Sequence, residues 1–384
     1  MRCPPLVSCP HSLAPLVEMK IFNCQQCGLM VYFSNTRCER CAHALGYLPE
    51  LTTLSALTPL EDGRFSPLAA PERTSRFCAN AAHAACNWLV PADSPDEYCR
   101  ACQLNRTIPP LNEGDNLLRW QRLEVAKHQL VYGLLRFGLP VVGKGEEPER
   151  GLAFDFLARL KGKGGKSAPV VTGHASGLIT IDVTEADDAE RERHRRDLAE
   201  PYRTLLGHFR HEVGHYYWDR LVNGGPWLDA FRTLFGDERQ DYGECLKTHY
   251  ADGPPADWRQ RFVSSYASTH PWEDFAETWA HYLHIVDTLE TAHAFGLRVQ
   301  PRGAQDAALT MEIDFDPYHQ SDFDVLLKTW LPLTYAVNSL NQSMGQPDLY
   351  PFVLAPAVMG KLRFVHALVF PAKVAAMNAL SAMQ

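Results

Sequence analysis

A His-Glu-x-x-His motif occupies residues 211–215 of this 384-residue chain. On a helix, positions four residues apart lie on the same face, so His211 and His215 can bind one zinc ion together. Glu212 lies beside this pair, where its carboxylate can take a proton from a zinc-bound water. A proline before the motif and two glycines after it predict a helix over about residues 201–222. The motif therefore predicts a hydrolytic zinc site on this helix.

A catalytic zinc ion needs a third protein ligand as well as an open position for water. A metzincin would take this ligand from a histidine six residues after His215, but that position is Leu221. Downstream, Pro271 can begin a helix that carries Glu273 and Glu277 one turn apart. The spacing indicates that one carboxylate binds zinc and that the other holds the free ring nitrogen of a ligand histidine. The residues alone leave open which glutamate takes which role.

Two Cys-x-x-Cys pairs near the N-terminus predict a structural zinc site. Cys24 and Cys27 form the first pair, and Cys38 and Cys41 form the second pair ten residues later. Four thiolates at this spacing can close a tetrahedral site. The apolar run at 29–33 between the pairs predicts a strand. Together these features predict a zinc ribbon.

A second group of cysteines comprises Cys78, Cys86, Cys99 and Cys102. Only the last two have Cys-x-x-Cys spacing, and His83 could replace one cysteine as a ligand. The alternative is that these residues are reduced thiols in a small core. We expect a second structural zinc site here, which gives one catalytic and one or two structural Zn²⁺ ions in the chain.

Composition and charge narrow the class of protein. The chain has a formal charge of −8, which argues against nucleic acid as a partner. No apolar run reaches the roughly 18 residues of a membrane-spanning helix. Eleven cysteines without a clean export signal favour metal ligands over disulfides and predict a cytoplasmic protein. Residues 1–18 are expected to be unstructured or to precede the true start at Met19.

The order of patterns predicts an α+β protein in which a small zinc-ribbon domain precedes a zincin-like catalytic domain. The zinc ribbons should occupy residues 19–108 and the catalytic domain residues 109–335. The catalytic domain should begin with a long helix over 116–137. A strand at 177–183 would suit a substrate-binding edge, because an extended peptide can pair with an exposed strand. The segment 336–384 is expected to pack on the catalytic domain.

The residues from Tyr266 to Glu277 resemble the second-helix motif of anthrax lethal factor, a gluzincin. In that family a tyrosine precedes the zinc-binding glutamate by seven residues, and a second glutamate follows it by four. The resemblance implies that Glu273 is the third zinc ligand and that Glu277 orients a ligand histidine. It also implies that Tyr266 donates a hydrogen bond to the oxyanion that forms during hydrolysis.

Across nearly its full length the chain resembles a bacterial family of zinc-dependent metallopeptidases that carry an N-terminal zinc-ribbon domain. Three blocks carry this resemblance: Cys-x-x-Cys-Gly at 24–28, the YRTLLGHFRHEVGHYYW block at 202–218 and the PWEDFAETWAHYLH block at 271–284. The resemblance implies a peptidase of gluzincin type with a peptide or protein substrate. It implies no particular substrate.

The implied reaction is metal-assisted hydrolysis of an amide, with Glu212 as general base and then as proton donor to the leaving amine. A rival hypothesis is a non-catalytic module in which the zinc ribbons bind a protein or nucleic acid partner and the zincin half is a degenerate scaffold. A third is an amidase for a non-protein substrate. The presence of Glu212 favours an enzyme, because a scaffold has no chemical need for a base there.

Other charged and titratable residues near the motifs are expected to be structural. Four histidines close to the motifs are interpreted as structural or surface residues: His208, His270, His281 and His284. Of these, His281 could reach the rim of the site. The lysine- and glycine-rich run at 161–166 lacks the spacing of a phosphate-binding loop and is interpreted as a solvated turn or flap.

Overall fold

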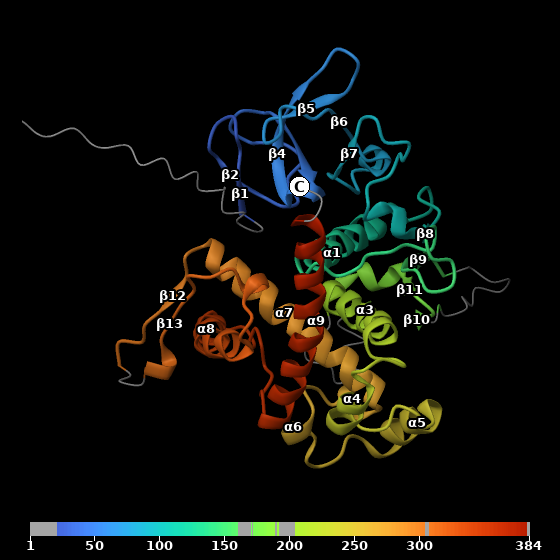
Figure 1. Ribbon diagram of the computed structural model, residues 1–384, viewed down its shortest axis with the longest axis vertical. Coiled ribbons are helices and arrows are strands. Elements are labelled where there is room, and N and C mark those ends of the chain that lie inside the picture. The colour runs from blue at the N-terminus through green and yellow to red at the C-terminus, as the bar shows by residue number, and fades with distance from the viewer. Residues whose placement is uncertain are drawn as a thin grey trace, which may run out of the picture.

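The protein has an α+β fold with a strand-rich N-terminal region and a mainly helical second part (Figure 1). The computed structural model describes residues 21–159, 170, 172–188, 190–191, 204–303 and 307–381, and for 371–381 the backbone only. The expectations for residues 1–18 and 161–166 concern residues outside this description.

The N-terminal region contains a two-stranded hairpin and a five-stranded antiparallel sheet. The hairpin pairs β1 (Ile21–Asn23) with β2 (Met30–Tyr32), and β2 is the strand expected between the cysteine pairs. The strands of the larger sheet follow in chain order: β3 (Ala44–Leu48), β4 (Thr53–Pro59), β5 (Phe65–Pro67), β6 (Ser75–Phe77) and β7 (Leu89–Pro91). Between β5 and β6 the pairing is reduced to Phe65 and Ser75.

The N-terminal region and the second part share one hydrophobic core. Helix α1 (Asn116–Arg136), the expected long helix, places Tyr132 against aromatic rings of the N-terminal region. The ring of Tyr132 lies 5.4 Å from that of Phe33 and 6.1 Å from that of Tyr47, between ring centroids. Edge-to-face contacts of this kind add to the stability from burial alone. The N-terminal strands are thus packed onto α1.

A four-stranded sheet lies beside α1 and α3 (Leu205–Leu221) with the order β10-β11-β9-β8 (Figure 1). Strands β8 (Asn105–Thr107), β9 (Ala153–Leu157) and β11 (Leu178–Asp182) are parallel, and β10 (Gly173–Ala175) pairs with β11 in the antiparallel sense. The expectation that the strand at 177–183 offers a substrate-binding edge is wrong, because β11 is paired on both sides. The strands at the two edges of this sheet are β10 and β8.

Helices make up most of the second part. Besides α1 they are α3 (Leu205–Leu221), α4 (Leu228–Phe235), α5 (Tyr242–Asp252), α6 (Trp258–Arg261), α7 (Pro271–Ala294), α8 (Phe323–Ser343) and α9 (Pro356–Ser381), with a short ribbon of β12 (Arg298–Val299) and β13 (Met311–Glu312). Thr204 caps α3 by accepting a hydrogen bond from the Gly207 amide. Pro271 occupies the first turn of α7, and the His270 ring accepts the Trp272 amide. These caps set where the two motif helices begin.

The C-terminal helix α9 packs against α4, α6 and α7. Its Lys361 ammonium lies 2.5 Å from the Asp274 carboxylate of α7 and donates to the Arg261 carbonyl of α6. Because both side chains are buried, removing one partner would leave the other as a buried charge without a counter-charge and would lower the stability of the fold. Among the described residues, no helix has the length and apolar character needed to cross a membrane.

Helices α3 and α7 approach each other closely at Gly214. A Cβ atom at this position would lie 2.9 Å from the Ala276 Cα and 3.3 Å from the Trp279 Cβ. Contacts under 3.0 Å to backbone atoms require a shift of the helix. Gly214 is therefore required for this packing distance, and the side chains on either side of the crossing depend on it.

We expect Gly214→Ala to lower the free energy of unfolding by about 1–3 kcal/mol, the usual cost of overpacking. Gly360→Ala in α9 is the matched control, because a Cβ atom there meets nothing within 4 Å. Alanine favours a helix over glycine, so the control should be neutral or slightly stabilising. Denaturant unfolding of both variants checks this, and equal effects of the two substitutions would contradict the close crossing.

Candidate active site and metal centres

The crossing of α3 and α7 brings together His211, His215 and Glu273. Their donor atoms lie within 4.8 Å of one another. The His211 Nε2 atom is 3.0 Å from Glu273 Oε2 and 3.2 Å from His215 Nε2, and His215 Nε2 is 3.5 Å from the same oxygen. Ligands at zinc-bond lengths of about 2.0–2.1 Å in a tetrahedron are separated by about 3.3 Å. The three atoms therefore have the separations of three zinc ligands.

The hydrogen bonding of these residues also fits a cation. Glu273 Oε2 is buried and has no hydrogen-bond partner among the described residues, although two imidazole nitrogens lie near it. A buried carboxylate oxygen without a donor is costly unless an ion satisfies it. The other oxygen, Oε1, accepts a hydrogen bond of 2.7 Å from the Tyr242 hydroxyl. One oxygen of Glu273 is thus fixed, and the other converges with the two histidines.

Glu277 lies on the opposite side of the His211 ring. Its Oε1 atom is 2.7 Å from His211 Nδ1, and its Oε2 atom accepts a hydrogen bond of 2.6 Å from the Ser264 hydroxyl. A carboxylate on the far ring nitrogen fixes the tautomer and the orientation of a ligand histidine. Glu273 thus lies against the Nε2 atoms of both histidines and Glu277 against the far nitrogen of His211, and the metal roles of the two glutamates stay predictions.

Glu212 directly follows His211 on α3, and its two carboxylate oxygens have different surroundings. Oε1 lies 3.1 Å from His208 Nε2, whereas Oε2 is buried with no hydrogen-bond partner among the described residues. Burial opposes ionisation of Glu212, but the charge and hydrogen bond of His208 prevail and lower the pKa of this carboxyl below its usual value. The carboxylate is therefore ionised and has one oxygen free.

Two tyrosines lie on the α5 and α7 side of the site. Tyr266 is in the 3-10 turn Tyr266–Ser268 before α7, with its ring centroid 6.0 Å from that of His211. Its hydroxyl hydrogen-bonds with that of Tyr242. Burial, and next the charge of Glu273, raise the pKa of Tyr266, so its hydroxyl keeps its proton. Tyr266 thus lies beside the candidate ligands as a neutral donor.

Two further rings border His215. The Trp272 ring stacks on it at 3.7 Å between centroids, and His174 of β10 lies 6.1 Å from both rings. Burial, followed by the charge of His215, lowers the pKa of His174 to about 4, and its Nε2 atom accepts a hydrogen bond from the Gly177 amide. His174 is therefore neutral, and through it the edge strand β10 lies next to the candidate ligand His215.

Three of the four histidines interpreted as structural have partners outside the site. His270 caps α7, His281 lies 2.8 Å from the Tyr350 hydroxyl, and His284 lies 3.3 Å from Arg210. His208 differs, because it contacts Glu212 directly. Its spacing of four residues before Glu212 was the available signal in the sequence. No local spacing indicated Tyr242, Trp272 or His174.

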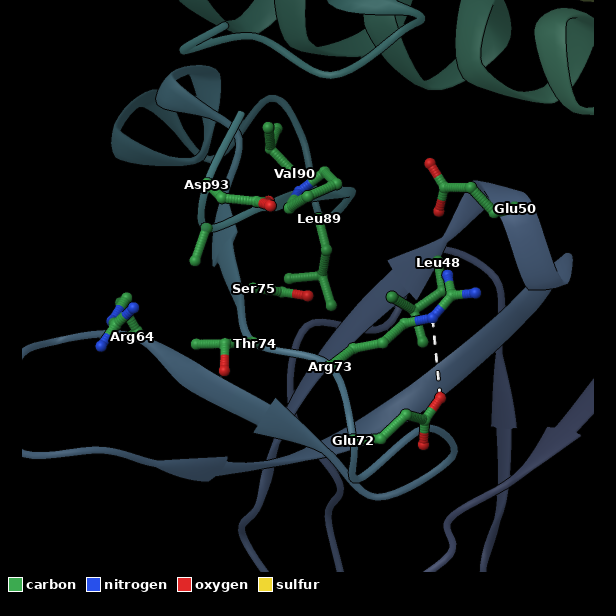
Figure 2. Close-up of a pocket in the computed structure, with 12 residues that line it drawn as sticks. Leu48, Glu50, Arg64, Glu72, Arg73, Thr74, Ser75, Leu89, Val90 and Asp93 are labelled. Atoms are coloured by element: carbon green, nitrogen blue, oxygen red, sulfur yellow. Dashed lines mark ion pairs between the residues drawn. The ribbon is translucent and has the colours of Figure 1, made fainter. Parts of the chain in front are cut away.

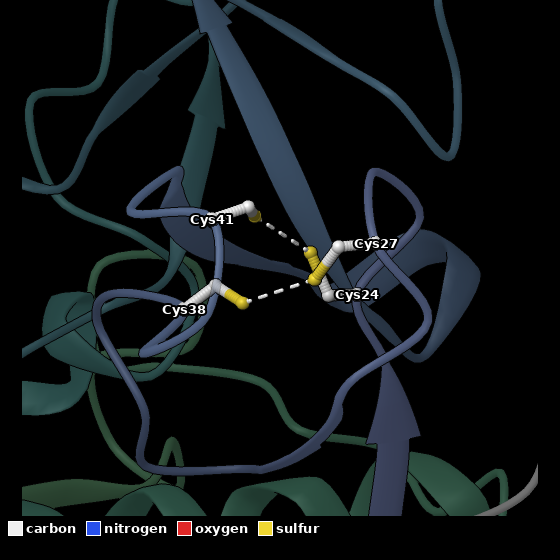
Figure 3. Close-up of side chains that lie close together, drawn as sticks. All are labelled: Cys24, Cys27, Cys38 and Cys41. Atoms are coloured by element: carbon white, nitrogen blue, oxygen red, sulfur yellow. Dashed lines mark hydrogen bonds between the residues drawn. The ribbon is translucent and has the colours of Figure 1, made fainter.

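The first cysteine group closes as the paired spacing predicts (Figure 3). The Sγ atoms of Cys24 and Cys41 are 3.5 Å apart, as are those of Cys27 and Cys38. Figure 3 shows the four side chains pointing toward one another from two loops. Backbone amide hydrogen bonds, the first involving Cys41, lower the pKa of Cys38 to about 6. Such bonds favour the thiolate that a zinc ion requires.

The second cysteine group is completed by polar residues of α1. Cys78, Cys86, Cys99 and Cys102 are all buried and lie together, and His83 is not part of the group. Three α1 side chains reach into this region: His128 lies 3.2 Å from Cys86 Sγ, and next to it the Lys127 ammonium lies 2.8 Å from the Glu124 carboxylate. A buried cationic side chain can offset thiolate charge. The centre therefore joins the N-terminal region to α1.

A pocket of about 520 Å³ in the five-stranded sheet lies apart from these centres (Figure 2). Its walls include Arg64 and Arg73, and Arg73 pairs with Glu72 at 3.7 Å. None of its lining residues belongs to a metal-ligand group found among the described residues. The pocket supplies no chemistry to the site between α3 and α7.

Comparison with known proteins agrees with this division of the chain. Residues 116–368 match a family described as "Putative zinc-binding metallo-peptidase", and residues 21–113 match a zinc-ribbon domain. An uncharacterised protein of Mycobacterium bovis is 42% identical over 352 residues, covering 91% of this chain and 95% of the relative. Two uncharacterised proteins of Mycobacterium tuberculosis strains match to the same extent. No solved structure matches this chain.

We expect the reduced, zinc-loaded chain to carry about three zinc ions, two in thiolate sites and one between α3 and α7. Chelation should remove the last ion first, because a site with an open position is easier to strip than a closed thiolate site. Elemental analysis during titration with a chelator measures both. One ion or fewer per chain would contradict the cysteine sites.

We expect Glu273→Ala to abolish metal binding between α3 and α7, because it removes a ligand. Glu277→Ala should weaken binding by about 10–100-fold, the usual effect of losing a carboxylate that orients a ligand histidine. Zinc titration by calorimetry separates the two effects, and Glu312→Ala on β13 is the control. The opposite order of severity would mean that the two glutamates exchange roles.

Proposed function

We propose that this chain, which belongs to the zinc-binding metallo-peptidase family, is a zinc-dependent peptidase of gluzincin type that hydrolyses peptide bonds. The observation that carries the proposal is the convergence of His211, His215 and Glu273 next to an ionised Glu212 with one free oxygen. Two helices far apart in sequence contribute these groups. A zinc site with three protein ligands and a neighbouring carboxylate is the arrangement of a hydrolytic centre.

The proposed chemistry assigns a separate task to each side chain. His211, His215 and Glu273 would hold a zinc ion, which would supply Lewis acidity to activate a water molecule and polarise a carbonyl. Glu212 Oε2 accepts the proton of the attacking water and then returns it to the leaving amine. The Glu277 carboxylate holds the His211 ring in the tautomer whose Nε2 lone pair faces the site.

The surroundings suggest how a peptide is placed. Strand β10, at one edge of the sheet formed by the described residues, borders the site through His174, and an edge strand can pair with the main chain of an extended peptide. Tyr266, kept neutral beside the site, is proposed to donate to the oxyanion of the tetrahedral intermediate. Tyr242 supports this arrangement, because it bonds both Glu273 and Tyr266.

The zinc-ribbon region is proposed to support the catalytic part, since the two share a core and the second cysteine group reaches α1. This favours a peptidase over a separate binding module, although the ribbons can still hold a protein partner. Because thiolate sites require reduced cysteines, the cytoplasm is the proposed compartment. A peptide or protein is the proposed substrate, and nucleic acid is not.

We expect zinc-loaded wild-type protein to cleave some members of a peptide library and Glu212→Gln to cleave none. The amide keeps the size of the side chain but cannot accept the proton, which costs at least about 10²–10⁴-fold in rate. Glu312→Gln on β13, an exposed carboxylate, is the control and should keep full activity. Mass spectrometry of the library measures cleavage. Equal cleavage by wild type and Glu212→Gln would contradict the proposed base.

We expect Tyr266→Phe to lower kcat by about 10–1,000-fold with little change in KM, because the lost hydrogen bond is made in the transition state. The phenyl ring still packs beside His211, so zinc content and melting temperature should stay the same. Tyr335→Phe on α8 removes an exposed hydroxyl as the control. Steady-state kinetics on a cleaved library peptide measures the effect. A variant with full kcat would leave Tyr266 as a packing residue.

A further inference from the structure

We propose that His208 and Glu185 act together as positioning residues that hold one oxygen of Glu212, so that only its other oxygen faces the reacting water. The inference extends the proposed function, because it assigns residues that fix the general base. His208 lies within the 202–218 block, but neither it nor Glu185 is a candidate metal ligand or one of the residues Glu273, Glu277 and Tyr266 to which the resemblance gives a role.

The geometry is a chain of three side chains in contact. His208 lies one helical turn before Glu212, with its Nε2 atom 3.1 Å from Glu212 Oε1. Its other nitrogen, Nδ1, lies 2.6 Å from Glu185 Oε2. The side chains of Glu185, His208 and Glu212 are only 5%, 14% and 8% exposed, so solvent screens these contacts little.

The chemistry of the acceptors fixes the protonation of the ring. An ionised carboxylate oxygen only accepts hydrogen bonds, so both nitrogens of His208 must carry a hydrogen to satisfy their two partners. Burial disfavours the charged ring, but Glu185 and Glu212 outweigh it and raise the pKa of His208 to about 10. His208 is therefore an imidazolium that donates in two directions, and its bond to Glu212 is charge-assisted.

Glu185 has hydrogen-bond partners of its own, so the contacts from Glu212 through His208 to Glu185 connect α3 to the sheet. It lies in the 3-10 turn Val183–Ala186 that directly follows β11. Its Oε1 atom accepts a hydrogen bond of 2.9 Å from the Thr172 hydroxyl, and its backbone carbonyl accepts one of 2.7 Å from Arg191. The position of Glu212 is thus set by the sheet through His208 as well as by its own helix.

The contact with His208 gives the two carboxylate oxygens of Glu212 different surroundings. Oε1 is occupied by His208, and Oε2 has no hydrogen-bond partner among the described residues. Without His208 the carboxylate could rotate, and either oxygen could turn away from the water. Because reaction rates fall steeply when a reacting group is misplaced, fixing the rotation should raise kcat. A purely structural ion pair between α3 and the turn after β11 would not require this difference between the two oxygens.

The contact can be tested without any substrate. In the ¹⁵N spectrum of histidine-labelled, zinc-loaded protein at neutral pH, we expect both ring nitrogens of His208 to be protonated, with signals assigned by their loss in His208→Gln. Glu212→Gln should shift the Nε2 signal, and Glu185→Gln should shift the Nδ1 signal. A neutral His208 ring, or signals that neither substitution moves, would overturn the proposal.

Two variants then separate positioning from structural support. In His208→Gln the side-chain amide reaches the place of Nε2 and can still donate to Glu212, whereas in His208→Asn it reaches only the place of Nδ1 and can donate to Glu185. We expect His208→Asn to lower kcat about 100-fold and His208→Gln no more than about 10-fold, with KM and zinc content unchanged in both. Equal losses in the two variants would overturn the positioning role.

Failure of the proposed function gives a different result. If wild-type protein cleaves no peptide in the library while both ¹⁵N shifts are found, then the peptidase assignment is wrong and the contact between His208 and Glu212 stands. If wild-type protein cleaves peptides and the shifts are missing, then the base is positioned by other means and the inference on His208 is wrong.

Discussion

The close crossing of α3 and α7 is the constraint on which the rest of the structure depends. Gly214 lets the two helices approach until Ala276 lies where a side chain would otherwise stand. This distance sets His211 and His215, which flank Gly214 in α3, against Glu273 and Glu277, which flank Ala276 in α7. A wider crossing would separate nitrogen and carboxylate ligands beyond the span of a single ion. The zinc site is therefore a consequence of helix packing, with both helices oriented by caps at their first turns.

Burial of many charges around this crossing is tolerated because each described one has a specific partner. Arg210 of α3 pairs with Asp287 of α7, and Lys361 of α9 pairs with Asp274. Breaking such a pair from one side is strongly destabilising, so these contacts hold α3, α7 and α9 in one arrangement. The side chains of His211, His215 and Glu273 are at most 11% exposed, and low exposure to solvent strengthens the electrostatic effect of each group. Two of the buried oxygens without a hydrogen-bond partner among the described residues, Glu212 Oε2 and Glu273 Oε2, belong to the candidate site.

The sequence predicted features that depend on local spacing and missed those that depend on contacts between distant segments. The spacing of four between His211 and His215, and the paired cysteines, follow from helix and loop geometry within a few residues. Tyr242 and His174 approach the site only through tertiary packing, which no local pattern reveals. The substrate edge was placed on β11, because a strand pattern does not show which strand is outermost. His208 had a readable helical spacing, but its partner Glu185 depends on the turn after β11.

Anomalous diffraction at the zinc absorption edge, from crystals of the full chain loaded with zinc, tests the central claim most directly. We expect a peak at bonding distance, about 2.0–2.2 Å, from His211 Nε2, His215 Nε2 and a Glu273 oxygen. We also expect Glu212 Oε2 to face the open side of that ion without coordinating it. Peaks at the cysteine groups alone, with none between α3 and α7, would contradict the account.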